Sequence, residues 1–243
     1  MVDLVIRFYS LRVLKDIVGH VMLIGLPLLL ITIMIALNEP HVPEEEFNNL
    51  VLFIGLAYTI MFQGFGAAYT SEGIENDFFK PFKSRLLVTP INPMRYVLMT
   101  LSTSIVLSFL QSTLLILYLM VVYQITINNV LGVLAALFLG VVLSQLLASL
   151  FIFLTKKAGT TQAIITVYLI AGMMVGGFFF SLPTSDLVVF LEKFSSPLAW
   201  VRYAAYGFID GDVTRILVGM GLLSLGIVIV GLFSYRLSQK VLK

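Results

Sequence analysis

Apolar runs long enough to cross a membrane dominate the chain. A transmembrane helix needs about 20 mostly apolar residues, because each residue rises about 1.5 Å and the hydrocarbon layer is about 30 Å thick. The third run is the longest, which is typical of a tilted span or of one that projects beyond the bilayer. The pattern predicts an all-α polytopic membrane protein, with a single domain over 1–243 and six transmembrane helices. The predicted spans are 17–37, 50–69, 94–123, 130–154, 161–180 and 213–235.

Composition supports a membrane location. Of the 243 residues, 59% are hydrophobic and only 12% are charged, whereas about 25% of the residues in a soluble domain are charged. The formal net charge of +2 gives no general attraction to nucleic acid. The chain has no cysteine, which excludes disulfides, thiol catalysis and cysteine-ligated metal sites.

The distribution of Lys and Arg predicts the orientation of the spans. An even number of spans places both termini on one side of the membrane. Every Lys and Arg except Lys193, Arg202 and Arg215 falls on that side, and the other side carries the acidic run Glu44–Glu46. Because cytoplasmic loops are enriched in Lys and Arg, both termini are predicted to be cytoplasmic.

The first residues, MVDLVIRFYSLRVLKD, do not resemble a cleavable signal, because the apolar run after them is too long and has no small-residue cleavage site. Asp3, Arg7 and Ser10 fall on one stripe of an otherwise apolar helix. This pattern predicts an N-terminal interfacial helix on the cytoplasmic side. The alternative is an extension of the first span.

The segment 181–212, between the last two spans, is only moderately polar. Ser196 followed by Pro197 is a typical helix start. Trp200, Tyr203 and Tyr206 follow at helical spacing, as in an interfacial aromatic belt, and Asp212 is placed to cap the sixth span. We expect a re-entrant outer segment of two short helices that dip into the outer leaflet. The alternatives are further partial spans or a plain surface loop.

Motifs for chemistry are absent. The sequence contains no G-x-x-x-x-G-K-[ST], H-E-x-x-H or G-x-S-x-G motif, so neither a nucleotide-binding loop nor a hydrolase site is indicated. His20 and His41 have no plausible partners for a metal site. The centres of the spans lack ionisable residues, which are usual in ion-coupled transporters. We expect that the chain is not itself an enzyme.

Neutral polar residues lie within the spans. One interpretation is that they line a path for an amphipathic substrate; the alternative is that they form hydrogen bonds between helices. The predicted path residues are Tyr58, Gln63, Thr100, Ser104, Ser108 and Gln111, and the fourth span adds Ser144, Gln145 and Ser149. In the fifth span, Gly172, Gly176 and Gly177 allow close backbone approach and are candidates for a dimer contact.

The densest charge cluster is EGIENDFFKPFKSRLLVTPINP, residues 72–93. Ile74, Phe78, Phe82 and Leu86 recur every four residues, and Pro81 interrupts the pattern. The interpretation is a short amphipathic cytoplasmic helix between the second and third spans. Its acidic residues would be repelled by anionic lipid, which favours a protein partner.

At this point the chain resembles the membrane permease subunits of ABC type-2 exporters. The resemblance rests on the order of three features over nearly the whole chain. One departure is Phe78-Phe79-Lys80-Pro81, where the family usually has a plainer polar helix. The features are Glu72-Gly73 with the later RLLVTPI at 85–91, the six spans after an N-terminal interfacial helix, and GFFF at 177–180 with Leu182-Pro183, Ser196-Pro197-Leu198, Tyr203 and Gly211-Asp212.

The resemblance implies a function. The segment after the second span would be a coupling helix that docks into a separate ABC ATP-binding subunit, and ATP and Mg would bind to that partner, with no cofactor in this chain. Two permease chains, identical or paralogous, would export a hydrophobic or amphipathic substrate such as a drug, a peptide or a lipid-like molecule. The implied location is a prokaryotic plasma membrane, surrounded by membrane lipids and without nucleic acid as a partner.

We expect the coupling contact to use residues 72–85. Two other functions stay open at this point: an ion-coupled secondary transporter, and a non-transporting membrane assembly subunit. The predicted ATPase-coupling residues are Glu72, Glu75, Asp77, Phe78, Phe79, Phe82, Lys83 and Arg85.

Overall fold

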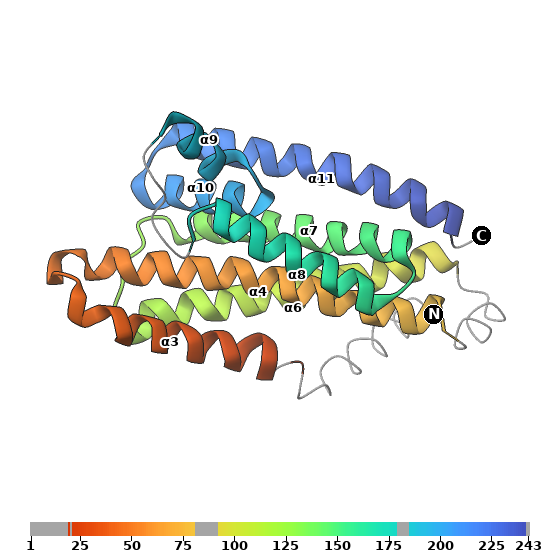
Figure 1. Ribbon diagram of the computed structural model, residues 1–243, viewed down its shortest axis with the longest axis horizontal. Helices are drawn as coiled ribbons and strands as arrows, with labels where there is room; N and C mark the ends of the chain where they lie inside the picture. The colour runs from red at the N-terminus through yellow and green to blue at the C-terminus, as the bar shows by residue number, and fades with distance from the viewer. Residues whose placement is uncertain (1–18, 20, 81–91, 179–184, 242–243) are drawn as a thin grey trace.

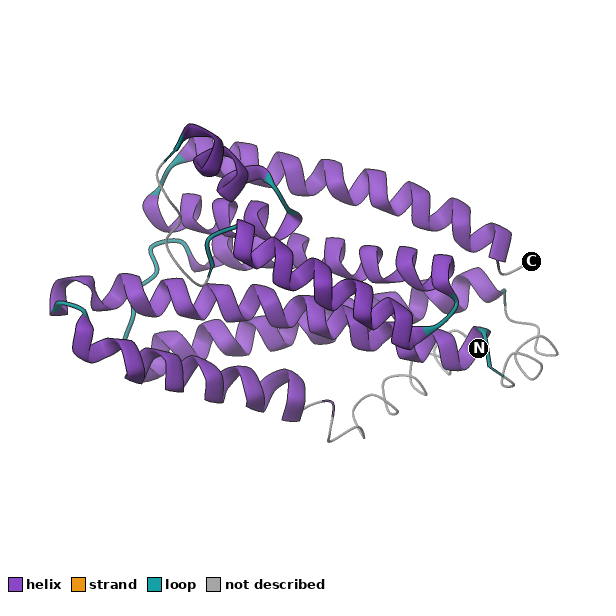
Figure 2. Ribbon diagram, viewed as in Figure 1, coloured by secondary structure: helices purple, strands orange, loops and turns teal. Residues whose placement is uncertain are grey.

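The computed structural model describes residues 19, 21–80, 92–178 and 185–241, and this part of the chain is helical without any strand (Figure 2). The long helices run side by side along the longest axis of the molecule (Figure 1). The helices are α3 (Leu26–Asn38), α4 (Phe47–Phe78), α6 (Pro93–Val122), α7 (Val130–Thr155), α8 (Ala158–Val175), α9 (Asp186–Phe194), α10 (Pro197–Asp210) and α11 (Val213–Val241), with short turns η1 (Val21–Gly25), η2 (Glu39–His41) and η3 (Glu44–Glu46).

Six of the described helical segments are long and apolar enough to cross a membrane, which confirms the predicted number of spans. Most of the predicted bounds lie within a few residues of the observed ones. Two spans run further than predicted. The sixth was predicted to end at Tyr235, but α11 continues to Val241; the second was predicted to end at Tyr69, but α4 continues to Phe78. Its last turns contain polar residues but no proline, and a proline is the strongest local reason for a helix to end.

Helix α4 forms the centre of the bundle. It packs against α3, α6, α7, α8 and α10, and most of its length is buried. By contrast, α11 packs on α7 and α10 and leaves a row of large apolar side chains exposed, including Leu217, Leu225 and Leu232. Since a membrane surrounds such a bundle with hydrocarbon, these outward apolar side chains are in the environment that suits them.

The two short helices predicted between the last two spans are present as α9 and α10, at one end of the bundle (Figure 1). Ser196 caps α10 as expected, accepting a hydrogen bond from the Ala199 N–H at 3.3 Å, with Pro197 in the first turn. Asp212 caps α11 through the N–H groups of Thr214 and Arg215 at 2.9 and 3.1 Å. The predicted position of α9 and α10 within the outer leaflet stays a prediction. The expected N-terminal interfacial helix and residues 181–184 lie outside the described residues.

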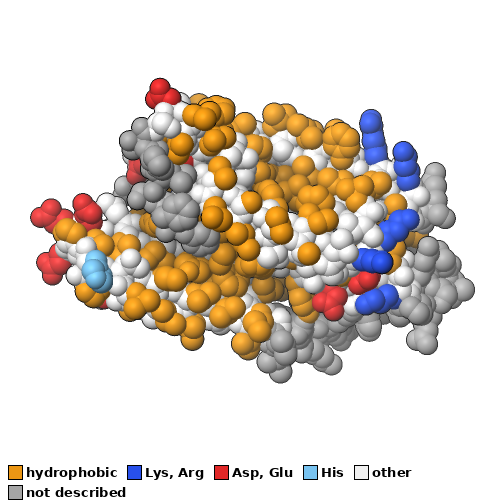
Figure 3. All heavy atoms as spheres, in the orientation of Figure 1, with side chains coloured by type: hydrophobic (Ala, Val, Ile, Leu, Met, Phe, Trp, Pro, Cys, Tyr) orange, Lys and Arg blue, Asp and Glu red, His pale blue; other side chains and the backbone are white. Residues whose placement is uncertain are grey.

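Charged side chains separate to the two ends of the bundle (Figure 3). We call the end where α4, α7 and α11 finish and where α6 and α8 start the basic end, and the opposite one the acidic end. Glu39, Glu44, Glu45, Glu46 and Asp186 lie at the acidic end. The described Lys and Arg residues of the basic end are Lys80, Arg95, Lys156, Lys157, Arg236 and Lys240.

Glycines allow α11 to approach α10 closely. A Cβ atom added to Gly219 would lie 2.8 Å from both the Cβ and the backbone N of Ala204. A Cβ atom added to Gly207 would lie 2.8 Å from the backbone N of Ile216. Both distances are shorter than van der Waals contact, so the two helix backbones can touch only because these positions lack a side chain.

Candidate functional site

The junction between α4 and α6 brings together the two ends of the segment that links the second and third spans. Asp77 lies in the last turn of α4 and Tyr96 in the first turn of α6. The Tyr96 hydroxyl donates a hydrogen bond to Asp77 Oδ2 at 3.0 Å. The neighbouring Phe78 ring meets the Tyr96 ring edge-on, with 5.5 Å between their centroids. Both ends of the linking segment are therefore fixed to each other.

This junction rests on a hydrophobic cluster separate from the main core. Its buried members come from α4, α6, α7 and α8, and the end of α11 packs against them. The basic end of the bundle thus supports the α4–α6 junction from five helices. The members are Ile74, Phe78, Tyr96, Val97, Leu101, Ile152, Phe153 and Ala158, with the partly buried Phe79, Leu237 and Val241.

The predicted coupling residues divide between two environments. Glu72 is exposed, and Glu75 and Phe79 are partly exposed. By contrast, Asp77 is only 2% exposed and Phe78 only 3%, so neither can contact a partner without leaving the cluster. Their position indicates a supporting role for these two side chains.

The expected separate helix starting near Ile74 is wrong for residues up to Phe78, because they continue α4 without a break. Lys80 Nζ lies 3.5 Å from Glu75 Oε2 and donates to Asn76 Oδ1 at 2.7 Å, which closes the end of α4. The other predicted residues of this group, Phe82, Lys83 and Arg85, lie outside the described residues, as does Pro81.

The six neutral polar residues predicted to line a path are all buried inside the bundle. Gln63 of α4 donates to Ser112 Oγ at 2.9 Å and to the Leu137 carbonyl at 3.3 Å. Gln145 of α7 donates to Ser108 Oγ at 3.2 Å. These contacts join α4, α6 and α7. For Gln63 and Ser108 the structure therefore agrees with the alternative interpretation, in which the polar residues form hydrogen bonds between helices.

The other predicted path residues are also enclosed. Gln111 of α6 donates to the Leu23 carbonyl in the turn before α3. Tyr58, Thr100 and Ser104 are 8%, 2% and 7% exposed. A substrate could reach these side chains only if the helices of this chain separated. A transport path through the interior of the described bundle is thus not favoured by the packing.

Replacing Gln63 with Leu should destabilise the protein by about 1 kcal/mol, because two hydrogen bonds between helices are lost at a buried position. Thermal unfolding of the purified protein in lipid nanodiscs measures the change. Thr113→Val is the control, because the Thr113 hydroxyl donates to the Phe109 carbonyl of its own helix and, among the described residues, to no other helix. Equal unfolding temperatures for Gln63→Leu and the unchanged protein would contradict the assignment.

The glycines predicted to form a dimer contact are buried against the chain's own residues. A Cβ at Gly172 would lie 3.1 Å from Leu198 of α10, and one at Gly176 would lie 2.8 Å from the Phe178 ring. Gly177 has a φ of +61° and faces Glu192. Contact with a second chain at these positions does not fit the structure, because the space is filled from within the chain.

A charged cluster at the acidic end was not predicted. Arg202 of α10 forms an ion pair with Glu192 of α9 at 2.8 Å and donates to the Gly177 carbonyl at 3.0 Å. Its guanidinium carbon also lies 4.3 Å from the centre of the Phe178 ring. Burial lowers the pKa of Arg202, and the nearby Glu192 carboxylate opposes this shift. A guanidinium is charged in proteins in any case. One side chain thereby holds α9 and the end of α8 to α10.

Beside Arg202 lies a cleft of about 240 Å³ that contains aromatic and charged side chains. Burial raises the pKa of Tyr206 to about 12, so its hydroxyl is neutral at physiological pH. The cleft is smaller than the roughly 300–1,000 Å³ usual for drug-sized ligands. The lining residues are Phe53, Glu192, Lys193, Ala199, Arg202, Tyr203, Tyr206 and Arg215.

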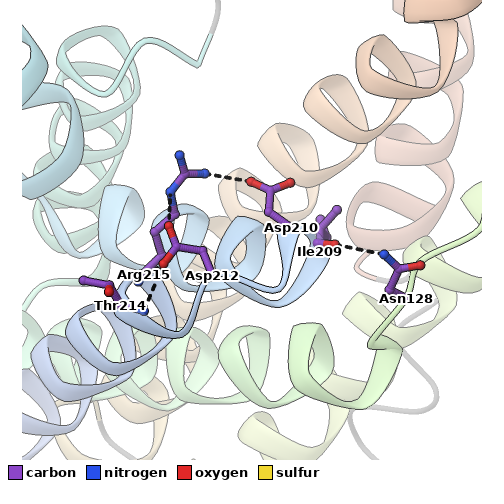
Figure 4. Close-up of polar contacts among 6 residues, drawn as sticks. All are labelled: Asn128, Ile209, Asp210, Asp212, Thr214 and Arg215. Atoms are coloured by element: carbon purple, nitrogen blue, oxygen red, sulfur yellow. Dashed lines mark hydrogen bonds and ion pairs between the residues drawn. The ribbon is translucent and has the colours of Figure 1, made fainter.

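The turn between α10 and α11 completes this end of the bundle (Figure 4). Arg215 pairs with Asp210 at 2.7 Å and with Asp212 at 3.2 Å. Asn128, in the connection between α6 and α7, donates to the Ile209 carbonyl at 3.3 Å. Both buried and exposed arginines at the acidic end thus find carboxylates within the chain.

Comparison with known families gives one match, to the family described as ABC-2 type transporter, over residues 6–211. The match extends through the first five spans and α10, and so includes both the α4–α6 junction and the Arg202 cluster. No curated protein matches the chain.

Proposed function

Because the chain belongs to the ABC-2 type transporter family, we propose that it is the permease subunit of an ATP-driven exporter. The sequence has no P-loop, so ATP and Mg would bind to a separate ATP-binding subunit. A second permease chain, identical or paralogous, would complete the membrane part. The alternative functions, an ion-coupled secondary transporter and a non-transporting assembly subunit, are separated from this one by the experiments below.

We place the basic end in the cytoplasm of a prokaryotic cell, following the excess of Lys and Arg there. The ATP-binding subunit would then contact the α4–α6 junction. The observation that carries this proposal is the Asp77–Tyr96 hydrogen bond on a cluster shared by five helices. A displacement of the α4–α6 junction by the partner would therefore move all five helices. Glu72 and Lys80 are exposed and available for the contact.

The substrate path would run along the outside of this chain, against the second permease chain. The polar residues of the spans are engaged within the bundle, and the outward faces of α6, α8 and α11 are apolar, with Leu110, Val167 and Leu225 all more than half exposed. An apolar wall suits hydrophobic or amphipathic cargo, such as a drug, a peptide or a lipid-like molecule.

Reversing the charge of Glu72 and Glu75 to Lys tests the coupling contact. We expect at least a tenfold loss of co-purified ATP-binding subunit and of ATP-dependent transport in proteoliposomes, because opposed like charges cost several kcal/mol at an interface. The change at Glu72 should alter stability little, because that residue is exposed. The change at Glu75 should cost more, because its side chain is only 18% exposed and pairs with Lys80, so thermal unfolding of the variant is measured beside the recovery of the partner.

The matched control is Glu44→Lys with Glu45→Lys, which makes the same charge change at exposed positions of the acidic end. This control should keep the partner and the transport activity. Equal loss in both variants, or in neither, would count against a contact at the α4 end. Transport driven by an ion gradient without ATP would indicate a secondary transporter, and a partner whose ATPase no substrate stimulates would indicate an assembly subunit.

A further inference from the structure

We propose that the basic end carries a binding surface for the headgroups of acidic phospholipids. It is formed by five cations on α6, α11 and the turn between α7 and α8, which we call the basic rim: Arg95, Lys156, Lys157, Arg236 and Lys240. The proposal requires only that the protein spans a membrane and does not rest on the proposed transport function.

The basic rim lies where the hydrophobic surface of the bundle ends (Figure 3). Exposed apolar side chains accompany its cations within one helical turn on the side of the apolar belt. Leu98 is 50% exposed one turn after Arg95, and Phe233 is 61% exposed one turn before Arg236. Such pairs place an apolar side chain in hydrocarbon and the neighbouring cation at the level of the lipid phosphates.

The cations of the basic rim have no carboxylate partner among the described residues. The described acidic residues of this end, Glu72, Glu75 and Asp77, all belong to α4; Glu75 pairs with Lys80 and Asp77 accepts from Tyr96. At the acidic end, by contrast, Arg202 and Arg215 are both paired with carboxylates. Within the described part of the chain, the arginines of the acidic end are thus neutralised, and the cations of the basic rim are open to an anion from outside.

Acidic lipid is the anion that fits this position. The mixed charges at the α4 end suit a protein surface, but the basic rim has only cations and is bordered by side chains that face hydrocarbon. The phosphate groups of a bilayer lie at the same level, at the border of the hydrocarbon layer. Each basic residue near a membrane surface increases the affinity for acidic lipid roughly fivefold. Several cations on neighbouring helices should therefore retain acidic lipid at this border.

The test uses the full chain in nanodiscs of mixed phosphatidylglycerol and phosphatidylcholine, with spin-labelled forms of each lipid as probes. We expect the protein to retain phosphatidylglycerol in preference to phosphatidylcholine. Changing all five rim residues to Gln should reduce this preference at least tenfold. The variant R95K, K156R, K157R, R236K and K240R keeps every charge and should keep the preference, because the attraction is electrostatic.

Equal retention of the two lipids by the unchanged protein would overturn the proposal, as would an undiminished preference in the Gln variant. If the Gln variant does not insert or fold, the same lipid preference is measured with the unchanged protein at low and high salt. Raising NaCl from about 50 mM to about 500 mM shortens the screening length severalfold. It should release the retained phosphatidylglycerol, and a preference insensitive to salt would reject the basic rim as its origin.

Discussion

Replacing Gly219 with Ala should destabilise the protein by about 2 kcal/mol or more. The added methyl group would lie 2.8 Å from the Cβ and backbone N of Ala204 and 2.9 Å from its Cα. These atoms belong to the α10 backbone or its first side-chain carbon, and no rotamer change can move them away. The two helices would have to separate, and overpacking of this kind costs about 1–3 kcal/mol, occasionally more.

Gly221→Ala is the matched control in the same helix, because a Cβ there meets nothing within 4 Å. It should leave stability within about 1 kcal/mol of the unchanged protein, with any change toward greater stability, since Ala favours a helix over Gly. Thermal unfolding in nanodiscs compares the three proteins. Equal unfolding temperatures for the two variants would show that α10 and α11 do not pack as described.

Sequence reasoning succeeded where the deciding chemistry is local. The six spans follow from the length of the apolar runs, and the starts of α10 and α11 follow from Ser196 with Pro197 and from Asp212; Asn92 with Pro93 at the start of α6 is a signal of the same kind. At each start the capping side chain accepts a hydrogen bond from an N–H two or three residues further on. Such contacts require no knowledge of the rest of the fold.

The end of α4 shows why the coupling segment was harder to predict. The second span was predicted to end at Tyr69, where the charged residues begin, yet a helix can leave the apolar layer and continue in a polar environment. The four-residue spacing of Ile74 and Phe78 correctly indicated a helix with an apolar face. It could not indicate that this face packs against Tyr96 and Ile152 of the chain itself, because that surface exists only in the folded bundle.

Contacts between distant helices account for the other differences. The spacing of Gly172 and Gly176 identified a site of close approach but not which helix would occupy it, and α10 does so with Leu198. Arg202 was counted only for its charge. A lone Arg in the apolar stretch of 197–209 could have signalled a buried pair, since burying an unpaired charge is costly. The pairing with Glu192 still depends on how α9 folds back on α10.

Arg202→Leu should destabilise the protein by about 2–4 kcal/mol. The substitution removes the donor to the Gly177 carbonyl and leaves Glu192 without its cation. Breaking a fully buried ion pair by removing one partner costs about 3–5 kcal/mol. The Glu192 side chain keeps 35% of its surface exposed, so solvent screening lowers the expected cost by about 1 kcal/mol. Thermal unfolding measures the loss, and proteolysis between α8 and α9 should become faster as α9 separates from α10.

Two further variants identify the cause of this loss. Arg215→Leu removes an arginine that is also paired but 39% exposed, and it should cost less than about 1 kcal/mol. The double variant Arg202→Leu with Glu192→Leu removes both charges and should be more stable than Arg202→Leu alone, because no uncompensated carboxylate remains. If the double variant is as unstable as the single one, the cost lies in the other contacts of the guanidinium, with the Phe178 ring and the Gly177 carbonyl. If Arg215→Leu is as unstable as Arg202→Leu, burial of Arg202 between three helices does not explain its contribution to stability.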